Sequence, residues 1–315
     1  MSSRLGLGEN LIFVISQPRA GSTLIQRILG CHPDIHTVSE PWLMLHPLYG
    51  LKSGAGFSAD YDAELARKAV QNFLRNMSSG EEELVRGMRH MYGNLYAKAL
   101  ESSGKRFFLD KTPRYYFIIP ELYRTFPQAH FIILIRNPVA VLCSIINAWV
   151  KGKWHRLKKY RFDLIRAPVL LVEGAEMLGD HGLAVSYEKL LEHPENEAMK
   201  MCQWFGVDVA PNIVQYGQAA LPRWSLGDQE NVYQRIGPDS DGANNWLFAL
   251  DNPQTWRVAN DYLDFLGKEL VEKMGYRYEE LRGVVEARRP SRTRLWFTSS
   301  MMRLLTKPNK KPESS

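Results

Sequence analysis

The sequence predicts an α/β fold with a single domain, in which helices flank one central parallel sheet. Apolar segments of strand length recur at residues 10–16, 107–110, 129–135 and 182–186, and a segment with helical periodicity follows each of them. Strands that alternate with helices in this way build a parallel sheet. The segments 10–16 and 129–135 are apolar almost throughout, as strands are when helices cover both faces of a sheet. No internal repeat or low-complexity linker interrupts residues 1–286.

The elements follow in order along the chain. After a turn at residues 17–21, apolar side chains recur at helical spacing and predict an amphipathic helix from Ser22 to about Gly30. The last strongly amphipathic helix is expected over residues 260–274, where Gly275 closes it. By the same patterns we expect a short strand at 37–39, helices over most of 58–104 with a break at 78–80, and helices at 117–126, 137–150 and 188–205.

The composition is that of a folded globular chain. The 315 residues are 45% hydrophobic and 23% charged, which excludes a disordered, collagen-like or coiled-coil protein. The longest apolar runs are far shorter than the ~18 residues of a membrane span. The apolar run near the N-terminus is also too short for a signal peptide. Three cysteines, odd in number and widely spaced, argue against a disulfide framework or a zinc site. We therefore expect a cytoplasmic protein that needs no metal.

The charge balance favours an anionic ligand. Forty basic and 34 acidic residues give a net charge of +6. A mild positive field of this kind suits an anion, whereas a nucleic-acid-binding protein is expected to carry a denser basic stripe. Nucleic acid is therefore not an expected partner.

The turn after the first strand has the chemistry of an anion site. A helix that begins at Ser22 and Thr23 offers unpaired N–H groups, the positive end of its dipole and two hydroxyl groups. Gly21 lets the backbone approach an oxyanion, and Arg19 adds a forked cation for a phosphate or sulfate. No Lys precedes Ser22, so the P-loop pattern of nucleotide kinases is not met. Taken alone, the turn is equally compatible with an ordinary strand–helix turn that Ser22 caps.

Two motifs together resemble the sulfotransferase family. Residues 17–24, Gln-Pro-Arg-Ala-Gly-Ser-Thr-Leu, resemble the family's loop for the 5′-phosphosulfate of 3′-phosphoadenosine 5′-phosphosulfate (PAPS). Residues 131–138 and Ser144 resemble its 3′-phosphate motif, in which a strand ends in Arg and a Ser follows in the next helix. Residues 185–190 resemble a segment whose Tyr contacts the nucleotide. The resemblance implies donor contacts from Arg19, Ala20, Gly21, Ser22, Thr23, Leu24, Arg136, Ser144 and Tyr187.

The resemblance also implies catalytic residues and a reaction. Glu40 stands where the tyrosylprotein branch of the family, which with bacterial sulfotransferases is nearest in motif pattern, keeps a catalytic Glu. Lys111 resembles the family's Lys that faces the transferred group. The implied reaction is sulfuryl transfer from PAPS to an acceptor hydroxyl, with Glu40 as general base and with Lys111 and Arg19 stabilising charge. His36 and His46 are rival bases, and Asp110 is expected either to orient Lys111 or to cap the turn.

Other segments leave alternatives open. Residues 46–104 and 151–180 match no motif, so we expect the acceptor, a small-molecule, sugar or peptide hydroxyl, to bind there. Residues 151–161 form a basic run with interleaved aromatic residues, which is either an acceptor surface or a solvated helix face. Asn245 stands where relatives often have Lys or Arg before a Trp. Residues 287–315 are expected to form a basic tail, for which contact with a membrane surface or with another subunit of an oligomer stays open. A kinase-like phosphotransferase and a non-catalytic nucleotide-binding relative are the alternative functions.

Overall fold

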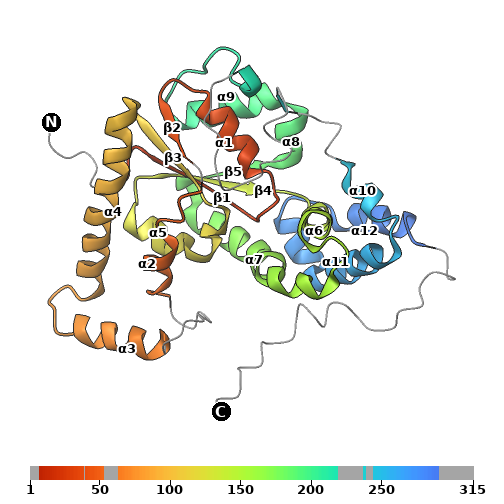
Figure 1. Cartoon of the computed structure of the whole chain (residues 1–315), viewed down its shortest axis with the longest axis horizontal. Coiled ribbons are helices and arrows are strands. Elements are labelled where there is room, and N and C mark those ends of the chain that lie inside the picture. Colours follow the sequence, from red (N-terminus) through yellow and green to blue (C-terminus); the bar gives the residue numbers. More distant parts are fainter. Residues whose placement is uncertain (1–6, 39, 53–62, 219–236, 239–243, 291–315) are drawn as a thin grey trace.

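Five parallel strands form the centre of the computed structural model, which describes residues 7–38, 40–52, 63–218, 237–238 and 244–290 (Figure 1). Within these residues the strands are β1 (Leu11–Ser16), β2 (Ile35–Thr37), β3 (Phe107–Lys111), β4 (His130–Ile135) and β5 (Gly182–Ser186). They lie side by side in the order β2-β3-β1-β4-β5, and every neighbouring pair is parallel. The predicted α/β fold with a central parallel sheet is confirmed.

Helices cover both faces of the sheet. The α-helices are α1 (Ser22–Gly30), α2 (Leu45–Tyr49), α3 (Ala63–Leu74), α4 (Glu81–Ser103), α5 (Ile119–Thr125), α6 (Pro138–Ile145), α7 (Arg161–Leu178), α8 (Tyr187–Glu192), α9 (Pro194–Phe205), α10 (Trp246–Ala249), α11 (Pro253–Lys273) and α12 (Tyr278–Ala287). In Figure 1, α1, α8 and α9 lie on one side of the sheet, and α2, α4, α5 and α7 lie on the other. Helices α10, α11 and α12 lie together beside α6, the helix that follows β4.

The alternation of side chains along the central strands explains this layering. All six residues of β1 are buried. Ile12 and Val14 contribute to the core cluster beneath α1, α6 and α9, whereas Phe13 and Ile15 contribute to the cluster beneath α4, α5 and α7. Because both faces are covered, both sets of residues must be apolar, and the strand is a continuous apolar run.

The strand predictions hold closely, with one shift. The segments predicted at 10–16, 107–110, 129–135 and 182–186 are β1, β3, β4 and β5, within two residues at each end. The second strand lies at Ile35–Thr37 rather than at 37–39, because residues 35–37 pair with β3 in register from Phe107 to Leu109.

The helix predictions need four corrections. The segment 188–205 is two helices, α8 and α9, because the backbone at His193 is not helical and Pro194 starts a new helix. The helix predicted from residue 260 begins at Pro253, where the Asn252 side chain accepts hydrogen bonds from the first turn. The segment 117–126 divides into the end of a 3₁₀ helix, Pro113–Ile118, and α5. The segment 137–150 begins as the α-helix α6 and continues as a π-helical turn over Ile146–Val150.

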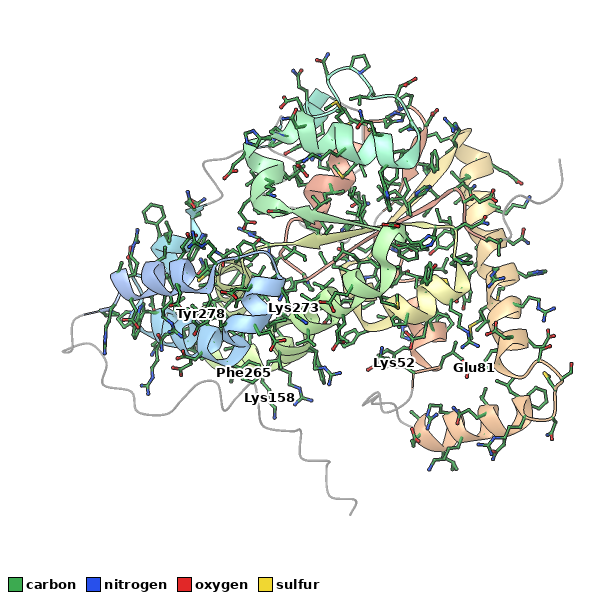
Figure 2. All side chains as sticks on the ribbon, turned by 180° about the vertical axis from the view of Figure 1, so that it is seen from behind. Lys52, Glu81, Lys158, Phe265, Lys273 and Tyr278 are labelled. Atoms are coloured by element: carbon green, nitrogen blue, oxygen red, sulfur yellow. The ribbon has the colours of Figure 1, made fainter. Side chains whose placement is uncertain are left out.

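The C-terminal part of the described chain also departs from expectation. Helix α12 was not predicted, and it packs through Leu281 and Val285, with the Trp256 indole donating to the Val285 carbonyl. The tail segment 291–315 lies outside the described residues. In Figure 2, which shows the molecule from behind, Phe265, Lys273 and Tyr278 of α11 and α12 lie on the opposite flank from Lys52 and Glu81. Among the described helices, none combines the length and the apolar character that crossing a membrane requires.

Candidate active site

The motif residues gather at the carboxyl edge of the sheet. The loop 17–21 follows β1, Lys111 ends β3, Arg136 follows β4 and Tyr187 follows β5. The chain continues from β1 toward β2 and β3 on one side and later returns to β4 on the other, so β1 and β4 flank the switch point of the topology. In open parallel sheets, ligands bind in the crevice outside the carboxyl ends of the strands at this point.

The loop after β1 has an unusual backbone that only a few residue types tolerate. Gly21 has φ 100° and Arg19 has φ 70°. A Cβ on Gly21 would also overlap the ring of Tyr187, so glycine is required for two independent reasons. Helix α1 begins directly after Gly21, and within the described chain no side chain caps its first N–H groups. Ser22 and Thr23 are buried at this end, and the side chains of Ala20 and Leu24 pack into the core. The backbone N–H groups of Ala20 and Leu24 donate within the loop, to the carbonyls of Gln17 at 3.1 Å and of Gly21 at 2.9 Å.

The two motifs are joined by direct contacts. The Arg19 Nε donates to Ser144 Oγ of α6 at 3.2 Å, and an Arg136 terminal nitrogen donates to the Arg19 carbonyl at 3.0 Å. Among the residues that the structure describes, the buried Nε of Arg136 has no hydrogen-bond partner. A buried N–H without a partner costs free energy, so this cation is suited to an anion that would complete it.

Tyr187 lies between the two motifs. The Arg136 guanidinium lies 4.2 Å from the centre of the Tyr187 ring, and the same ring lies against Gly21. The neighbouring Glu188 accepts from the Asn137 backbone N–H at 3.1 Å and from the Tyr276 hydroxyl at 2.6 Å. Burial raises the pKa of the Tyr276 hydroxyl, and the nearby Glu188 carboxylate raises it further, so Tyr276 stays a donor. These bonds fix the start of α6 against the segment after β5.

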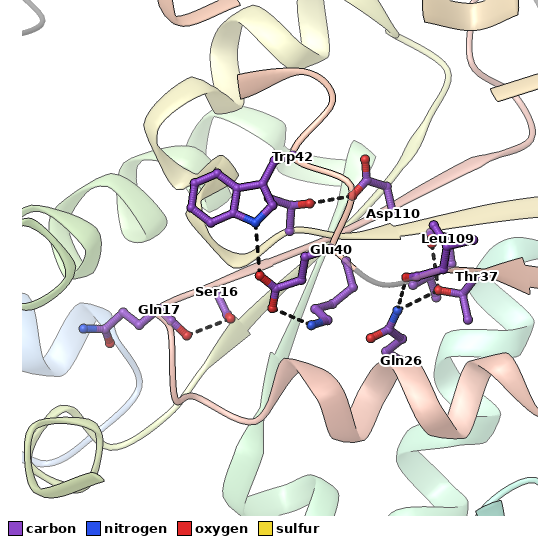
Figure 3. Close-up of polar contacts among 11 residues, drawn as sticks. Ser16, Gln17, Gln26, Thr37, Glu40, Trp42, Leu109 and Asp110 are labelled. Atoms are coloured by element: carbon purple, nitrogen blue, oxygen red, sulfur yellow. Dashed lines mark hydrogen bonds and ion pairs between the residues drawn. The ribbon is translucent and has the colours of Figure 1, made fainter. Parts of the chain in front are cut away.

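Glu40 and Lys111 form an ion pair at the same edge. Lys111 Nζ donates to Glu40 Oε1 at 2.6 Å, and the Trp42 indole Nε1 donates to Glu40 Oε2 at 3.2 Å (Figure 3). The side chain of Lys111 is 1% exposed and that of Glu40 is 15% exposed. Both carboxylate oxygens therefore have a donor, and the ammonium group has a carboxylate partner within a buried site.

Asp110 is buried at the end of β3 among three hydroxyl donors. Its carboxylate accepts from the hydroxyls of Tyr96 at 2.7 Å, Thr112 at 2.8 Å and Tyr115 at 2.9 Å. The Tyr115 hydroxyl accepts in turn from the Met44 backbone N–H at 3.0 Å. Burial raises the pKa of Asp110 to about 6, although these hydrogen bonds and nearby Lys111 oppose the shift. Asp110 thus anchors the segment after Glu40 to β3.

The rival histidines lie elsewhere. His36 lies inside β2, where it pairs in register with Phe108 of β3 and contacts the edge of its ring. Phe108 is three positions before Lys111, which ends β3. Burial and nearby Lys105 lower the pKa of His36. His46 is exposed on α2. In the described ranges, no group of three or more His, Cys, Asp or Glu side chains is arranged to hold a metal ion.

The sequence reasoning missed a polar cluster beside Glu40. Arg114 donates to both carboxylate oxygens of Asp163, at 2.9 and 2.7 Å, and its guanidinium lies 5.5 Å from the centre of the Trp42 ring. The Gln17 side chain donates to the Asp163 carbonyl at 2.9 Å. Residues 114 and 163 are far apart in the chain, and the only sequence signal was the position of Trp42 two residues after Glu40.

The basic run 151–161 borders this edge. It forms a 3₁₀ helix, Trp154–Tyr160, that leads into α7, and Lys151, Lys153, Lys158 and Lys159 are exposed. Trp149 and Tyr160 stack at 4.8 Å between ring centres, and the Arg19 guanidinium lies 5.9 Å from the Trp149 ring. The Trp149–Tyr160 pair therefore lies beside Arg19 of the anion loop, residues 17–21.

Comparison with known proteins identifies the family. A model described as "Sulfotransferase family" matches residues 11–211, which is more than half of the chain. The chain is similar to nodulation protein NoeE of Sinorhizobium fredii, with 28% identity over 289 residues that cover 84% of this chain and 66% of that protein. It is also similar to a putative protein-tyrosine sulfotransferase of Caenorhabditis briggsae, with 25% identity over 280 residues, covering 82% of this chain and 88% of that protein.

Two solved sulfotransferase domains are among the structures that this chain matches. The sulfotransferase domain from the curacin biosynthetic pathway has a TM-score of 0.49 and 20% identity, covering 75% of this chain and 89% of that domain. The sulfotransferase domain of the Synechococcus PCC 7002 olefin synthase has a TM-score of 0.49 and 22% identity, covering 75% and 86%.

Proposed function

Because the chain belongs to the sulfotransferase family, we propose that it transfers a sulfuryl group from PAPS to an acceptor hydroxyl. The observation that carries this proposal is the joining of the two motifs through Arg19, which contacts both Ser144 and Arg136, beside the Glu40–Lys111 pair. The site thus combines cations for a doubly phosphorylated donor with a carboxylate for an acceptor proton.

The chemistry of the loop and of Arg136 fits such a donor. The first N–H groups of α1, the two hydroxyls at its start and Arg19 would hold the 5′-phosphosulfate. Arg136 and Ser144 would hold the 3′-phosphate, since Arg136 keeps a buried N–H to be satisfied and a guanidinium binds phosphate well. Tyr187 would contact the nucleotide from the segment after β5. Ala20 and Leu24, whose backbone N–H groups donate to Gln17 and Gly21, would hold the shape of the loop around the donor.

Glu40 would act as the general base. A glutamate carboxylate is ionised at neutral pH and can accept the proton of the acceptor hydroxyl as its oxygen attacks sulfur. The bond between sulfur and the bridging phosphate oxygen breaks, and negative charge grows on the phosphate. Lys111 and Arg19 would stabilise this charge, because fixed cations in a water-poor site act strongly on developing anions. The buried position of Lys111 fits this role.

The acceptor is proposed to approach across the basic run. Exposed lysines at 151, 153, 158 and 159, with the Trp149–Tyr160 pair beside them, suit a small-molecule, sugar or peptide acceptor that carries negative charge and a ring. The relatives include proteins named as protein-tyrosine sulfotransferases, which is compatible with a hydroxyl acceptor.

Ligand-induced thermal stabilisation tests the donor. Adenosine 3′,5′-bisphosphate, the desulfated product, should stabilise the protein by about 2.7 kcal/mol at ~100-fold excess over its dissociation constant. For a chain of this size, that corresponds to roughly 5 °C in Tm. ADP and AMP, which lack the 3′-phosphate, should give clearly smaller shifts, and Arg136→Gln should remove the preference.

Transfer activity tests the base. Glu40→Gln should keep the shift with the bisphosphate but lose most of the transfer from PAPS to a panel of phenolic and sugar hydroxyls. A shift with ADP alone, or with no nucleotide, would contradict the donor assignment. Full transfer by Glu40→Gln would contradict the base assignment and leave the donor assignment standing.

A further inference from the structure

The strongest unassigned feature beside the site is the indole of Trp42. Its N–H donates to Glu40 Oε2, while Lys111 donates to Oε1 from β3. The two donors approach different oxygens from different parts of the chain, which fixes the plane of the carboxylate. The indole N–H can only donate a hydrogen bond, so Trp42 cannot accept the proton that Glu40 would take from the acceptor.

The backbone at Trp42 is held in a conformation that bulky residues rarely adopt. Its φ is 54°, in the left-handed region. Such a residue costs of order 1–3 kcal/mol and persists only where the surroundings hold it, most often at functional sites. This conformation lets the side chain of Trp42 turn back onto a residue only two positions earlier.

A partly buried ion pair holds the ring in place. The Arg114 guanidinium lies 5.5 Å from the centre of the Trp42 ring and is itself fixed by two hydrogen bonds to Asp163, which is 3% exposed. The Tyr116 hydroxyl donates to the same carboxylate at 2.8 Å. A forked pair of bonds fixes the plane of a guanidinium, so the ring packs on a rigid cationic surface.

The same cluster reaches the anion loop. Gln17, the first residue of that loop, donates to the Asp163 carbonyl through its side chain. A continuous set of contacts therefore runs from the loop through Asp163, Arg114 and Trp42 to Glu40. The orientation of the base is thereby tied to the loop that would hold the donor.

We propose that Trp42 is a positioning residue that orients the Glu40 carboxylate toward the acceptor, and that Arg114 and Asp163 hold Trp42 for this task. The proposal rests on the proposed sulfuryl transfer, because it gives Glu40 its role as base. It assigns Trp42 to the proton-transfer step and not to donor binding.

An indole N–H spectrum tests the contact without turnover. The chain has eight tryptophans, so ¹⁵N-tryptophan labelling gives a small set of indole signals. Trp42→Phe keeps an aromatic ring for Arg114 and identifies the signal of residue 42 by its loss. That signal should move in Glu40→Gln, whereas the signal lost in the control Trp204→Phe should not, since Trp204 packs beside His130 on the far side of β4. An unmoved Trp42 signal would overturn the proposal.

Kinetics test the role. Trp42→Phe should lower kcat about tenfold, the usual effect of losing a hydrogen bond to a charged group, while KM for PAPS stays within about twofold. In a Glu40→Gln background, Trp42→Phe should lower the residual rate no further, because the indole acts through the carboxylate. Arg114→Lys, which keeps the charge but loses the fork, should lower kcat less than Arg114→Ala. Trp204→Phe should match the wild type.

The outcomes separate this proposal from the proposed function. A wild-type protein that neither binds adenosine 3′,5′-bisphosphate nor transfers sulfuryl groups would refute the function. Two results with an active wild-type protein would refute only the positioning role. In the first, Trp42→Phe leaves kcat unchanged; in the second, Trp42→Phe lowers kcat by the same factor in the wild-type and the Glu40→Gln backgrounds.

Discussion

The Glu40–Lys111 pair makes a quantitative prediction about stability. Lys111 is 1% exposed and Glu40 is 15% exposed, with 2.6 Å between the charged atoms. Glu40→Gln removes the carboxylate from a buried ammonium group and should destabilise the protein by about 3–5 kcal/mol. Lys111→Met leaves Glu40 with some solvent and the Trp42 N–H, so its cost should be smaller, about 2 kcal/mol.

The double variant should recover most of this loss. With Gln at 40 and Met at 111 no buried charge is left unpaired, and replacing such a pair by neutral groups is often nearly neutral. We therefore expect the double variant to lie within about 1–2 kcal/mol of the wild type, which corresponds to a coupling energy of about 3–6 kcal/mol.

Urea unfolding of the four proteins measures the coupling. The matched control is the cycle Lys98→Met and Glu101→Gln, because this pair has a similar distance, 2.7 Å, but side chains that are 69% and 64% exposed. Exposed pairs of this kind couple by less than about 1 kcal/mol. If the Glu40–Lys111 cycle were additive within about 0.5 kcal/mol, the buried pair would not exist in solution and its proposed part in catalysis would fail.

Three further predictions follow from the same edge of the sheet. Because burial raises the pKa of Asp110 from 3.8 to about 6, the folded protein holds this proton more tightly than the unfolded chain, and stability should fall as the pH rises through this interval. The loss should be ~3 kcal/mol, and Asp110→Asn should remove it; parallel urea profiles for wild type and variant at pH values of about 4 and 7 would contradict this. Gly21→Ala should destabilise the protein by at least ~2 kcal/mol in urea, since φ is 100° and the new Cβ would overlap Tyr187, and an unchanged midpoint would be the contrary result. Arg136→Lys should weaken the binding of adenosine 3′,5′-bisphosphate at least ~10-fold in calorimetry and the binding of AMP much less, because a lysine cannot reproduce the two parallel bonds of a guanidinium. Equal losses of affinity for both nucleotides would argue against a 3′-phosphate contact.

The residues that we propose to hold the donor stand at local sequence signals. Arg19 and Arg136 each follow an apolar strand and precede a helix, and a parallel sheet brings such positions to one edge. Ser144 was chosen by its spacing from Arg136, and its contact with Arg19 spans 125 residues of sequence. Resemblance to the family's two motifs thus selected the residues, but the contacts among them come only from the topology.

The errors have physical causes of the same kind. Pro194 carried the signal that ends one helix and starts another, and apolar periodicity across it hid the break. The contacts among Trp42, Arg114 and Asp163 could not be foreseen from the sequence. Arg114 and Asp163 lie 49 residues apart in the chain, and Arg114 meets Trp42 only over the face of the indole ring. For Asp110, orienting Lys111 and capping the turn were both expected, and the bonds to Tyr96 and Tyr115 were not, because successive residues of a strand point to opposite faces and the sequence did not show which side chains Asp110 meets.

Backbone strain gives an independent argument for where the acceptor lies. Four described residues other than glycine have a positive φ: Arg19, Trp42, Lys151 and Asn212. The first is in the anion loop, the second contacts Glu40, and the third ends the π-helical turn that carries Trp149 beside Arg19. Strained conformations persist where packing over-determines them, and they cluster at functional sites. That Lys151 shares a positive φ with Arg19 and Trp42 favours the proposal that the acceptor reaches Glu40 from the side of the basic segment 151–161.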